Sequence, residues 1–142
     1  MKVNWNELQH ASGDVIVVED NPLIQTLLEE MLTEIGFSSV VFDNAVSALT
    51  HLKKIKGCCA LIIADYGLPG GMTGSEFLRA IEETWPSTPA ILTSGYPINE
   101  TEIPPSAIYL HKPFTLDQLE SSIAIALFAS RPPVLGLKES LL

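Results

Sequence analysis

The sequence predicts an α/β fold in which a doubly wound, five-stranded parallel sheet carries helices on both faces. Short apolar runs alternate with amphipathic segments about five times along the 142 residues, as is typical of repeated strand and helix units. The runs are continuous, as expected of strands buried on both faces. Hydrophobic residues make up 46% of the chain, enough for one core without disulfides or structural metal.

The first unit begins with the apolar run DVIVVE (14–19). The residues DNP (20–22) then predict a helix start, since a capping residue precedes a proline in the first turn. Gly36 supplies the stop. The predicted buried face consists of apolar residues spaced four apart: Leu23, Leu27, Met31 and Ile35.

The second unit is a strand over SSVVFD (38–43) and a helix over 44–56. Its apolar side is formed by Val46, Leu49, Leu52 and Ile55. The third strand is predicted over CCALIIA (58–64). Cys58 and Cys59 would point to opposite faces and have no further cysteine partner. We therefore interpret them as buried strand residues rather than a redox or metal pair.

A Gly-rich loop (65–74) precedes a helix that ends before Pro86. PAILTS (89–94) predicts the fourth strand. Residues 96–106 are polar and contain three prolines, so that the fourth helix is expected to be short or irregular, with at most one or two turns.

The last unit is the strand AIYLH (107–111) and a helix that continues to Ala129. Thr115 and Gln118 form a capping box at its start.

We expect one domain over 13–130, an N-terminal extension (1–12) and a C-terminal tail (131–142). The net charge is −9, which repels phosphate backbones and argues against direct nucleic-acid binding. No apolar run has the length of a signal peptide or the roughly 18 residues of a membrane span. We therefore expect a cytoplasmic protein without membrane contact.

Polar residues follow four of the five predicted strands. In an open parallel sheet these positions meet at one edge, just outside the carboxyl ends of the strands. They are Glu19 and Asp20 after the first strand, Asp65 after the third, Thr93 and Ser94 after the fourth, and Lys112 after the fifth. Each alone has an ordinary explanation as a helix cap, a solvated loop residue or a surface charge. Together, three clustered carboxylates require a neutralising cation, and oxygen ligands favour Mg²⁺ or a similar ion.

This arrangement suits phosphoryl transfer. An oxygen-ligated Mg²⁺ site leaves room for phosphate oxygens, and Lys112 supplies positive charge for them. The glycines after Asp65 allow close backbone approach. A carboxylate in such a site can act as a nucleophile, which makes Asp65 the expected acceptor of a phosphoryl group.

At these residues the chain resembles a response-regulator receiver domain of two-component signalling. The motifs occur in order and span nearly all of 13–130: VVED (17–20), LIIADYGLPGG (61–71), ILTSG (91–95) and YLHKPF (109–114). The resemblance implies a flavodoxin-like sheet with the strand order 2-1-3-4-5.

The resemblance also implies roles for individual residues. Glu19 and Asp20 are the acidic pair that binds Mg²⁺ (or Mn²⁺), and Asp65 is the phosphoacceptor and a third ligand. The backbone carbonyl of Gly67 is a further metal ligand. Lys112 contacts the phosphoryl group, and the peptide bond to the proline after it is typically cis.

Ser94 best matches the switch hydroxyl of the family, by its position after Pro89, and Thr93 is the alternative. Tyr109 matches the aromatic side chain that changes rotamer on phosphorylation. An ordinary core aromatic is the competing interpretation of Tyr109.

The chain departs from the common family pattern in three places. The loop PGGMTG (69–74) is one residue longer, a variant associated with receivers that are attached to hybrid histidine kinases or work beside them. The fourth helix is expected to be short or irregular, and the face around this helix is the one that the family often uses for output and dimerisation. No DNA-binding or enzymatic output domain is expected after residue 130.

The expected function is therefore that of a phosphoacceptor in a phosphorelay, not an enzyme beyond its own phosphotransfer and autodephosphorylation. Its expected partners are a histidine kinase or histidine phosphotransfer protein, a downstream protein reached by direct contact, and a second copy of the chain. One alternative is a pseudo-receiver that is never phosphorylated and acts as an interaction module. A second is an aspartate-nucleophile phosphatase, but that class needs an acid at position 67, where this chain has glycine.

Overall fold

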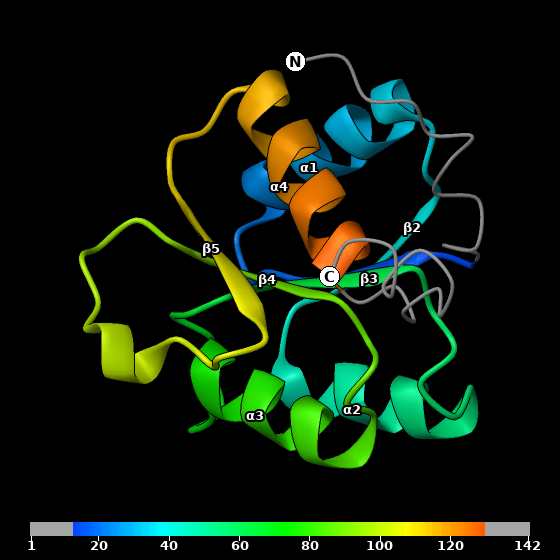
Figure 1. Ribbon diagram of the computed structural model, residues 1–142, viewed down its shortest axis with the longest axis vertical. Coiled ribbons are helices and arrows are strands. Elements are labelled where there is room, and N and C mark those ends of the chain that lie inside the picture. Colours follow the sequence, from blue (N-terminus) through cyan, green and yellow to red (C-terminus); the bar gives the residue numbers. More distant parts are fainter. Residues whose placement is uncertain (1–12, 130–142) are drawn as a thin grey trace, which may run out of the picture.

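The computed structural model describes residues 13–129, so the predicted extension (1–12) and tail (131–142) lie outside the described part. The strands are β1 (Val15–Val18), β2 (Ser39–Phe42), β3 (Leu61–Asp65), β4 (Ala90–Ser94) and β5 (Ala107–His111), and the α-helices are α1 (Pro22–Ile35), α2 (Ala45–Lys54), α3 (Gly74–Thr84) and α4 (Leu116–Ala129). The strands form one parallel sheet in the order β2-β1-β3-β4-β5. Helices α1 and α4 cover one face, and α2 and α3 cover the other (Figure 1). The predicted doubly wound fold is confirmed.

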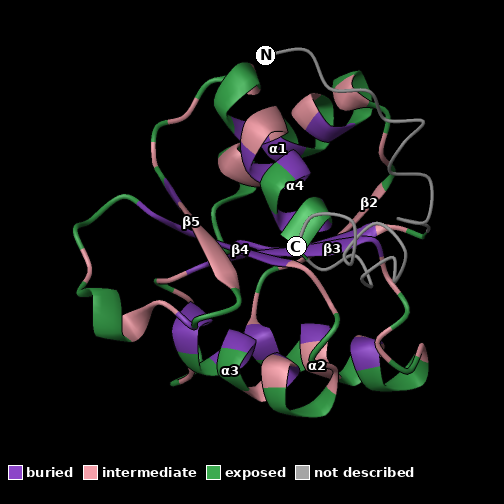
Figure 2. Ribbon diagram, in the orientation of Figure 1, coloured by how far each residue is buried: buried purple, intermediate pink, exposed green. Residues whose placement is uncertain are grey.

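The core consists of two hydrophobic clusters, one on each face of the sheet. Successive strand residues point to opposite faces. Val15 and Val17 therefore join the cluster under α1 and α4, while Ile16 and Val18 join the cluster over α2 and α3. All four are fully buried, and Figure 2 shows the burial concentrated along the sheet and the inner helix faces. The sheet thus provides a rigid support for the residues at its carboxyl edge.

The predicted helix signals at the two ends of the domain are confirmed. The Asn21 side chain accepts hydrogen bonds from the first turn of α1, and Gly36 ends that helix with φ 116°. At α4, the Thr115 hydroxyl accepts from Gln118 N and the Gln118 side chain accepts from Thr115 N. None of the described helices is long and apolar enough to cross a membrane.

The predicted apolar faces of α1 and α2 are partly wrong. Leu23 is 78% exposed and Leu27 is 49% exposed, whereas Leu28 and Leu32 carry the buried face of α1. Residues four apart drift by about 40° per step around a helix of 3.6 residues per turn, so a strict spacing of four selects a stripe that turns away from the sheet. On α2, Val46 is likewise exposed, and small alanines contact the sheet instead.

The interpretation of Cys58 and Cys59 as buried strand residues is wrong. Strand β3 begins only at Leu61, and Cys58 is exposed while Cys59 is half-buried. Gly57 has φ 72°, and Cys58 N still donates to Ile55 O. Cys58 therefore belongs to the turn that follows α2, where the apolar run predicted a strand.

The segment between β4 and β5 contains only a 3₁₀ turn, η2 (Glu100–Glu102). The sequence prediction of a short or irregular fourth helix is confirmed. The flanking prolines explain it, because proline removes a backbone donor and restricts the residue before it.

Candidate functional site

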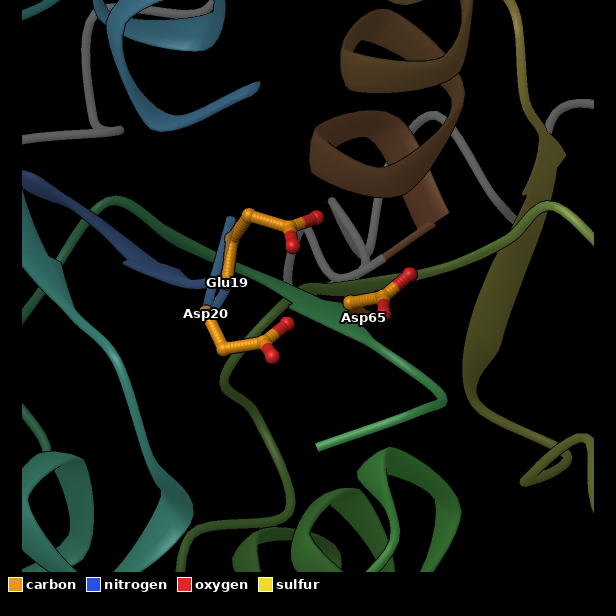
Figure 3. A group of neighbouring side chains, drawn as sticks. All are labelled: Glu19, Asp20 and Asp65. Carbon is orange, nitrogen blue, oxygen red and sulfur yellow. The ribbon is translucent and has the colours of Figure 1, made fainter. Parts of the chain in front are cut away.

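Three carboxylates meet at the carboxyl edge of the sheet. Glu19 and Asp20 directly follow β1, and Asp65 ends the neighbouring strand β3. One oxygen atom of each side chain lies within 4.8 Å of the others (Figure 3). Glu19 and Asp65 are buried, whereas Asp20 is exposed and forms the outer side of the cluster.

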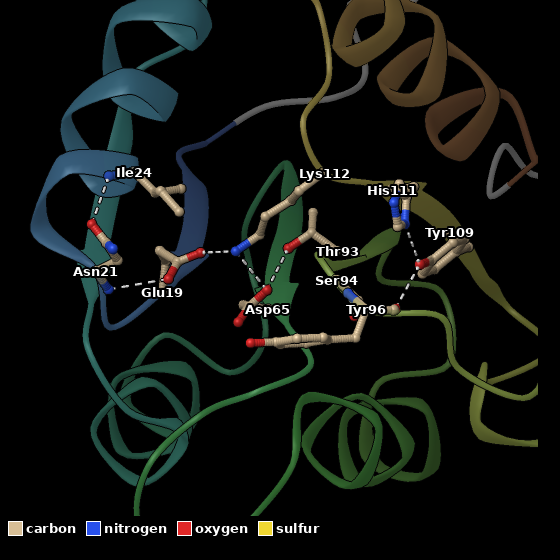
Figure 4. A network of polar contacts seen from close by, with 10 residues as sticks. All are labelled: Glu19, Asn21, Ile24, Asp65, Thr93, Ser94, Tyr96, Tyr109, His111 and Lys112. Atoms are coloured by element: carbon tan, nitrogen blue, oxygen red, sulfur yellow. Dashed lines mark hydrogen bonds and ion pairs between the residues drawn. The ribbon is translucent and has the colours of Figure 1, made fainter.

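Lys112 supplies a positive charge to this cluster. It follows β5, where its N–H donates to Ser94 O at 2.9 Å. Its Nζ lies 2.8 Å from Glu19 Oε1 and 2.8 Å from Asp65 Oδ1 (Figure 4). Burial alone would lower the pKa of Lys112, but the hydrogen bonds and charges of the two carboxylates raise it above its usual value. The peptide bond from Lys112 to Pro113 is cis, as the family resemblance implied.

The site is nevertheless short of positive charge. Burial is the main cause that raises the pKa of Glu19 above its usual value, and the charge of Asp65 adds to it. Hydrogen bonds from Lys112 Nζ and from Asn21 N (3.1 Å) act in the opposite direction without cancelling the effect. Three carboxylates thus face one ammonium group, which favours the entry of a cation.

The oxygen positions fit a hard divalent cation. Mg²⁺ binds oxygen at about 2.1 Å, so two of its ligands lie at most about 4.2 Å apart. The three carboxylate oxygens lie within 4.8 Å of one another, which is close to this limit. The backbone of Gly67 lies close by, since a Cβ at that position would be 3.7 Å from Asp65 Oδ2. Its carbonyl stays a predicted ligand.

The two neighbouring hydroxyls of β4 have different partners. Thr93 is paired in register with Asp65, and its Oγ1 donates to Asp65 Oδ1 at 3.2 Å. Ser94 Oγ instead donates to Tyr96 O at 2.7 Å and accepts from Tyr96 N at 3.0 Å. In this conformation the hydroxyl in contact with the carboxylate is that of Thr93, whereas Ser94 is bound to the following loop.

Tyr109 contacts the same loop residue, Tyr96, as Ser94 does. Its hydroxyl donates to Tyr96 O at 3.4 Å and lies 3.1 Å from His111 Nδ1. Tyr109 is half-buried and therefore differs from a fully enclosed core aromatic. Sequence reasoning missed Tyr96 and His111. The alternation of a strand could have identified His111, because residues two apart on β5 share a face.

Comparisons with known proteins identify the family of the chain. The sequence model of the response regulator receiver domain matches residues 15–124. The transcriptional regulatory protein FixJ of Bradyrhizobium diazoefficiens is 26% identical over 124 residues, which are 84% of this chain and 59% of FixJ. YkoG, an uncharacterized transcriptional regulatory protein of Bacillus subtilis, is 31% identical over 119 residues, 81% of this chain and 51% of YkoG. The sensor protein TorS of Escherichia coli is 33% identical over 87 residues, which cover 61% of this chain and 9% of TorS.

Solved structures show the same fold. A response regulator receiver protein from Sinorhizobium medicae superimposes with a TM-score of 0.77 at 24% identity, covering 84% of this chain and 98% of that one. The receiver domain of the sensor histidine kinase PA1611 from Pseudomonas aeruginosa has a magnesium ion in its active site cleft. It superimposes with a TM-score of 0.71 at 23% identity, covering 82% of this chain and 99% of that one. From the family match and the site geometry together, we conclude that the chain belongs to the response regulator receiver domain family.

Proposed function

We propose that this chain is a phosphoacceptor in a two-component phosphorelay, in which Asp65 takes a phosphoryl group from a phosphohistidine. The observation that carries the proposal is the contact of Lys112 Nζ with Asp65 inside a cluster of three carboxylates. A structural ion pair needs one acid and one base. The additional acids gather more negative charge than the lysine balances, as expected of a site completed by a metal ion and a phosphoryl group.

Glu19, Asp20 and Asp65 would hold Mg²⁺ or Mn²⁺, with the Gly67 carbonyl as a further ligand. The bound ion would neutralise charge on the phosphoryl oxygens. The three clustered carboxylates support this assignment, as does the magnesium ion in the PA1611 receiver domain.

In the proposed transfer, a carboxylate oxygen of Asp65 forms a bond to phosphorus while the P–N bond of the phosphohistidine breaks. The electron pair of that bond stays on the imidazole nitrogen. Lys112 shifts its hydrogen bonds from the carboxylates to the phosphoryl oxygens and balances their charge. Its two present contacts, both at 2.8 Å, place the ammonium group beside the acceptor before transfer.

The proposed response uses the shared contacts of Ser94 and Tyr109. Both hydroxyls now donate to the same carbonyl, Tyr96 O. A phosphoryl group on Asp65 would offer Ser94 a charged acceptor, and charge-assisted hydrogen bonds are stronger than neutral ones. Movement of Ser94 would release Tyr96 O and change the contacts of Tyr109, which biases the domain toward a second conformation.

Receiver domains are signalling phosphoacceptors rather than enzymes in the usual sense, and the relatives of this chain include regulators and a sensor protein. We propose a histidine kinase or a histidine phosphotransfer protein as the donor. A downstream protein would read the second conformation by direct contact, and hydrolysis of the acyl phosphate would end the signal.

Incubation with acetyl phosphate and Mg²⁺, followed by intact-mass measurement, tests the proposal. We expect one phosphate adduct that needs Mg²⁺ and is absent from Asp65→Asn, a variant of nearly the same shape. Circular dichroism of Asp65→Asn checks that it is folded. Absence of an adduct, both here and with phosphohistidine donors, would favour the pseudo-receiver alternative.

A further inference from the structure

Thr93 and Ser94, the two hydroxyl residues at the end of β4, have different hydrogen-bond partners. Thr93 is 1% exposed and contacts the acceptor carboxylate, while Ser94 is 2% exposed and contacts the Tyr96 backbone. We propose that Thr93 is a positioning residue, which fixes the Asp65 carboxylate for phosphoryl transfer. This inference rests on the proposed function of Asp65, and it assigns Thr93 a role other than that of switch hydroxyl.

The direction of the hydrogen bond between Thr93 and Asp65 is determined by chemistry. An ionised carboxylate can only accept, so the threonine hydroxyl donates its one proton to Asp65 Oδ1. Thr93 is β-branched and lies in a strand, which restricts its χ1 rotamers. Its backbone is also held, since Tyr66 N donates to Thr93 O at 2.8 Å. The hydroxyl is therefore a fixed donor.

Thr93 and Lys112 bind the same oxygen of Asp65. Both contacts in Figure 4 converge on Oδ1, at 3.2 Å from Thr93 Oγ1 and 2.8 Å from Lys112 Nζ. The other oxygen, Oδ2, is the one that faces Gly67. Two donors on Oδ1 restrict the movement of the carboxylate, and Oδ2, which neither of them contacts, would be the oxygen that bonds to phosphorus.

The two donors differ in what happens to them during transfer. Lys112 is expected to move its hydrogen bonds to the phosphoryl oxygens, and its long side chain permits this. Thr93 cannot follow, because its hydroxyl is anchored in the sheet. It therefore continues to hold Oδ1 when Lys112 has left, at the stage where misplacement of the reacting oxygen costs most.

Acetyl phosphate labelling of substituted proteins tests the kinetic consequence. Oδ2 bonds to phosphorus, the P–O bond to the acetyl group breaks, and its electron pair leaves with acetate. Thr93→Val keeps the branched shape without the donor and should slow labelling at saturating acetyl phosphate about tenfold, with little change in the half-saturating concentration. Thr93→Ser restores the donor and should recover most of the rate. Thr50→Val, an exposed matched change on α2, should label like the wild type.

A second measurement does not depend on phosphorylation. The Asp65 carboxyl ¹³C signal of the metal-free protein should shift in Thr93→Val and stay close to the wild-type position in Thr93→Ser. An unshifted signal in Thr93→Val, or labelling at the wild-type rate, overturns the inference. If the wild type takes up no phosphate from acetyl phosphate or from phosphohistidine donors, the proposed function fails, while the carboxyl signal still decides whether Thr93 holds Asp65.

Discussion

Lys112 Nζ lies 2.8 Å from Asp65 Oδ1, and these two residues come from the ends of strands that are not neighbours in the sheet. β4 lies between β3 and β5, so the lysine reaches across the β4 end to the carboxylate. The same ammonium group contacts Glu19 on the far side. Lys112 thereby joins the ends of β1, β3 and β5 and supplies positive charge to both carboxylates.

Replacement of Lys112 by methionine should destabilise the metal-free domain by about 2 kcal/mol, because Glu19 and Asp65 lose a charged hydrogen-bond donor. Added Mg²⁺ should recover part of this loss. Urea unfolding with EDTA and with Mg²⁺ measures both effects. Lys54→Met, an exposed change on α2, is the matched control and should change little. Equal stability of Lys112→Met and wild type in EDTA would contradict the structural role of this ion pair.

The difference in stability between wild type and Lys112→Met should also depend on pH. The pKa of Lys112 is raised in the folded state, so its contribution to stability is complete below its usual value of 10.5 and is lost as the pH rises through the raised value. The stability difference between wild type and Lys112→Met should therefore persist through neutral pH and shrink only in strong alkali. A difference that vanishes between pH 7 and 9 would contradict the assignment.

Gly74 should not tolerate a side chain. A Cβ at this first residue of α3 would lie 2.2 Å from the Asp65 carbonyl oxygen, a backbone atom that cannot move alone. Alanine favours a helix over glycine by about 1 kcal/mol, but overpacking typically costs about 1–3 kcal/mol, so we expect net destabilisation. Thermal unfolding of Gly74→Ala checks this. In Gly95→Ala nothing lies within 4 Å of the new Cβ, and its melting temperature should change much less.

The two cysteines should react with thiol reagents at different rates. Burial raises the pKa of Cys59 to about 11, so about one in a thousand of its thiols is ionised at pH 8, and the thiolate is the reactive form. Cys58 is exposed. Reaction with Ellman's reagent should show a fast phase that Cys58→Ser removes, and a slow phase that accelerates as the pH approaches 11. A fast phase that survives in Cys58→Ser would contradict the assignment.

Sequence patterns were sufficient for much of this fold. The apolar runs located all five strands, and the capping residues Asn21 and Thr115 located two helix starts. These signals are local, because a cap or a buried strand depends on few neighbours. The convergence of Glu19, Asp20 and Asp65 also followed, since parallel strands end at one edge.

Features that depend on tertiary packing could not be read in this way. Leu23 and Leu27 are exposed because the stripe of α1 that contains Leu28 and Leu32 packs against the sheet. Both stripes of α1 contain apolar residues, so the sequence does not show which one is buried. The placement of Cys58 before the strand depends on how α2 unwinds. The contact of Thr93 with Asp65 depends on the strand register, which no single-strand pattern contains.

The most direct test of the central claim is to locate the phosphoryl group after reaction with acetyl phosphate and Mg²⁺. Sodium borohydride reduces an aspartyl phosphate to homoserine, which peptide mass spectrometry identifies by position. The proposed mechanism predicts homoserine at position 65 alone, and none when Mg²⁺ is chelated before the reaction. Homoserine at Asp20 or another carboxylate, with Asp65 intact, would contradict the claim that Asp65 is the acceptor.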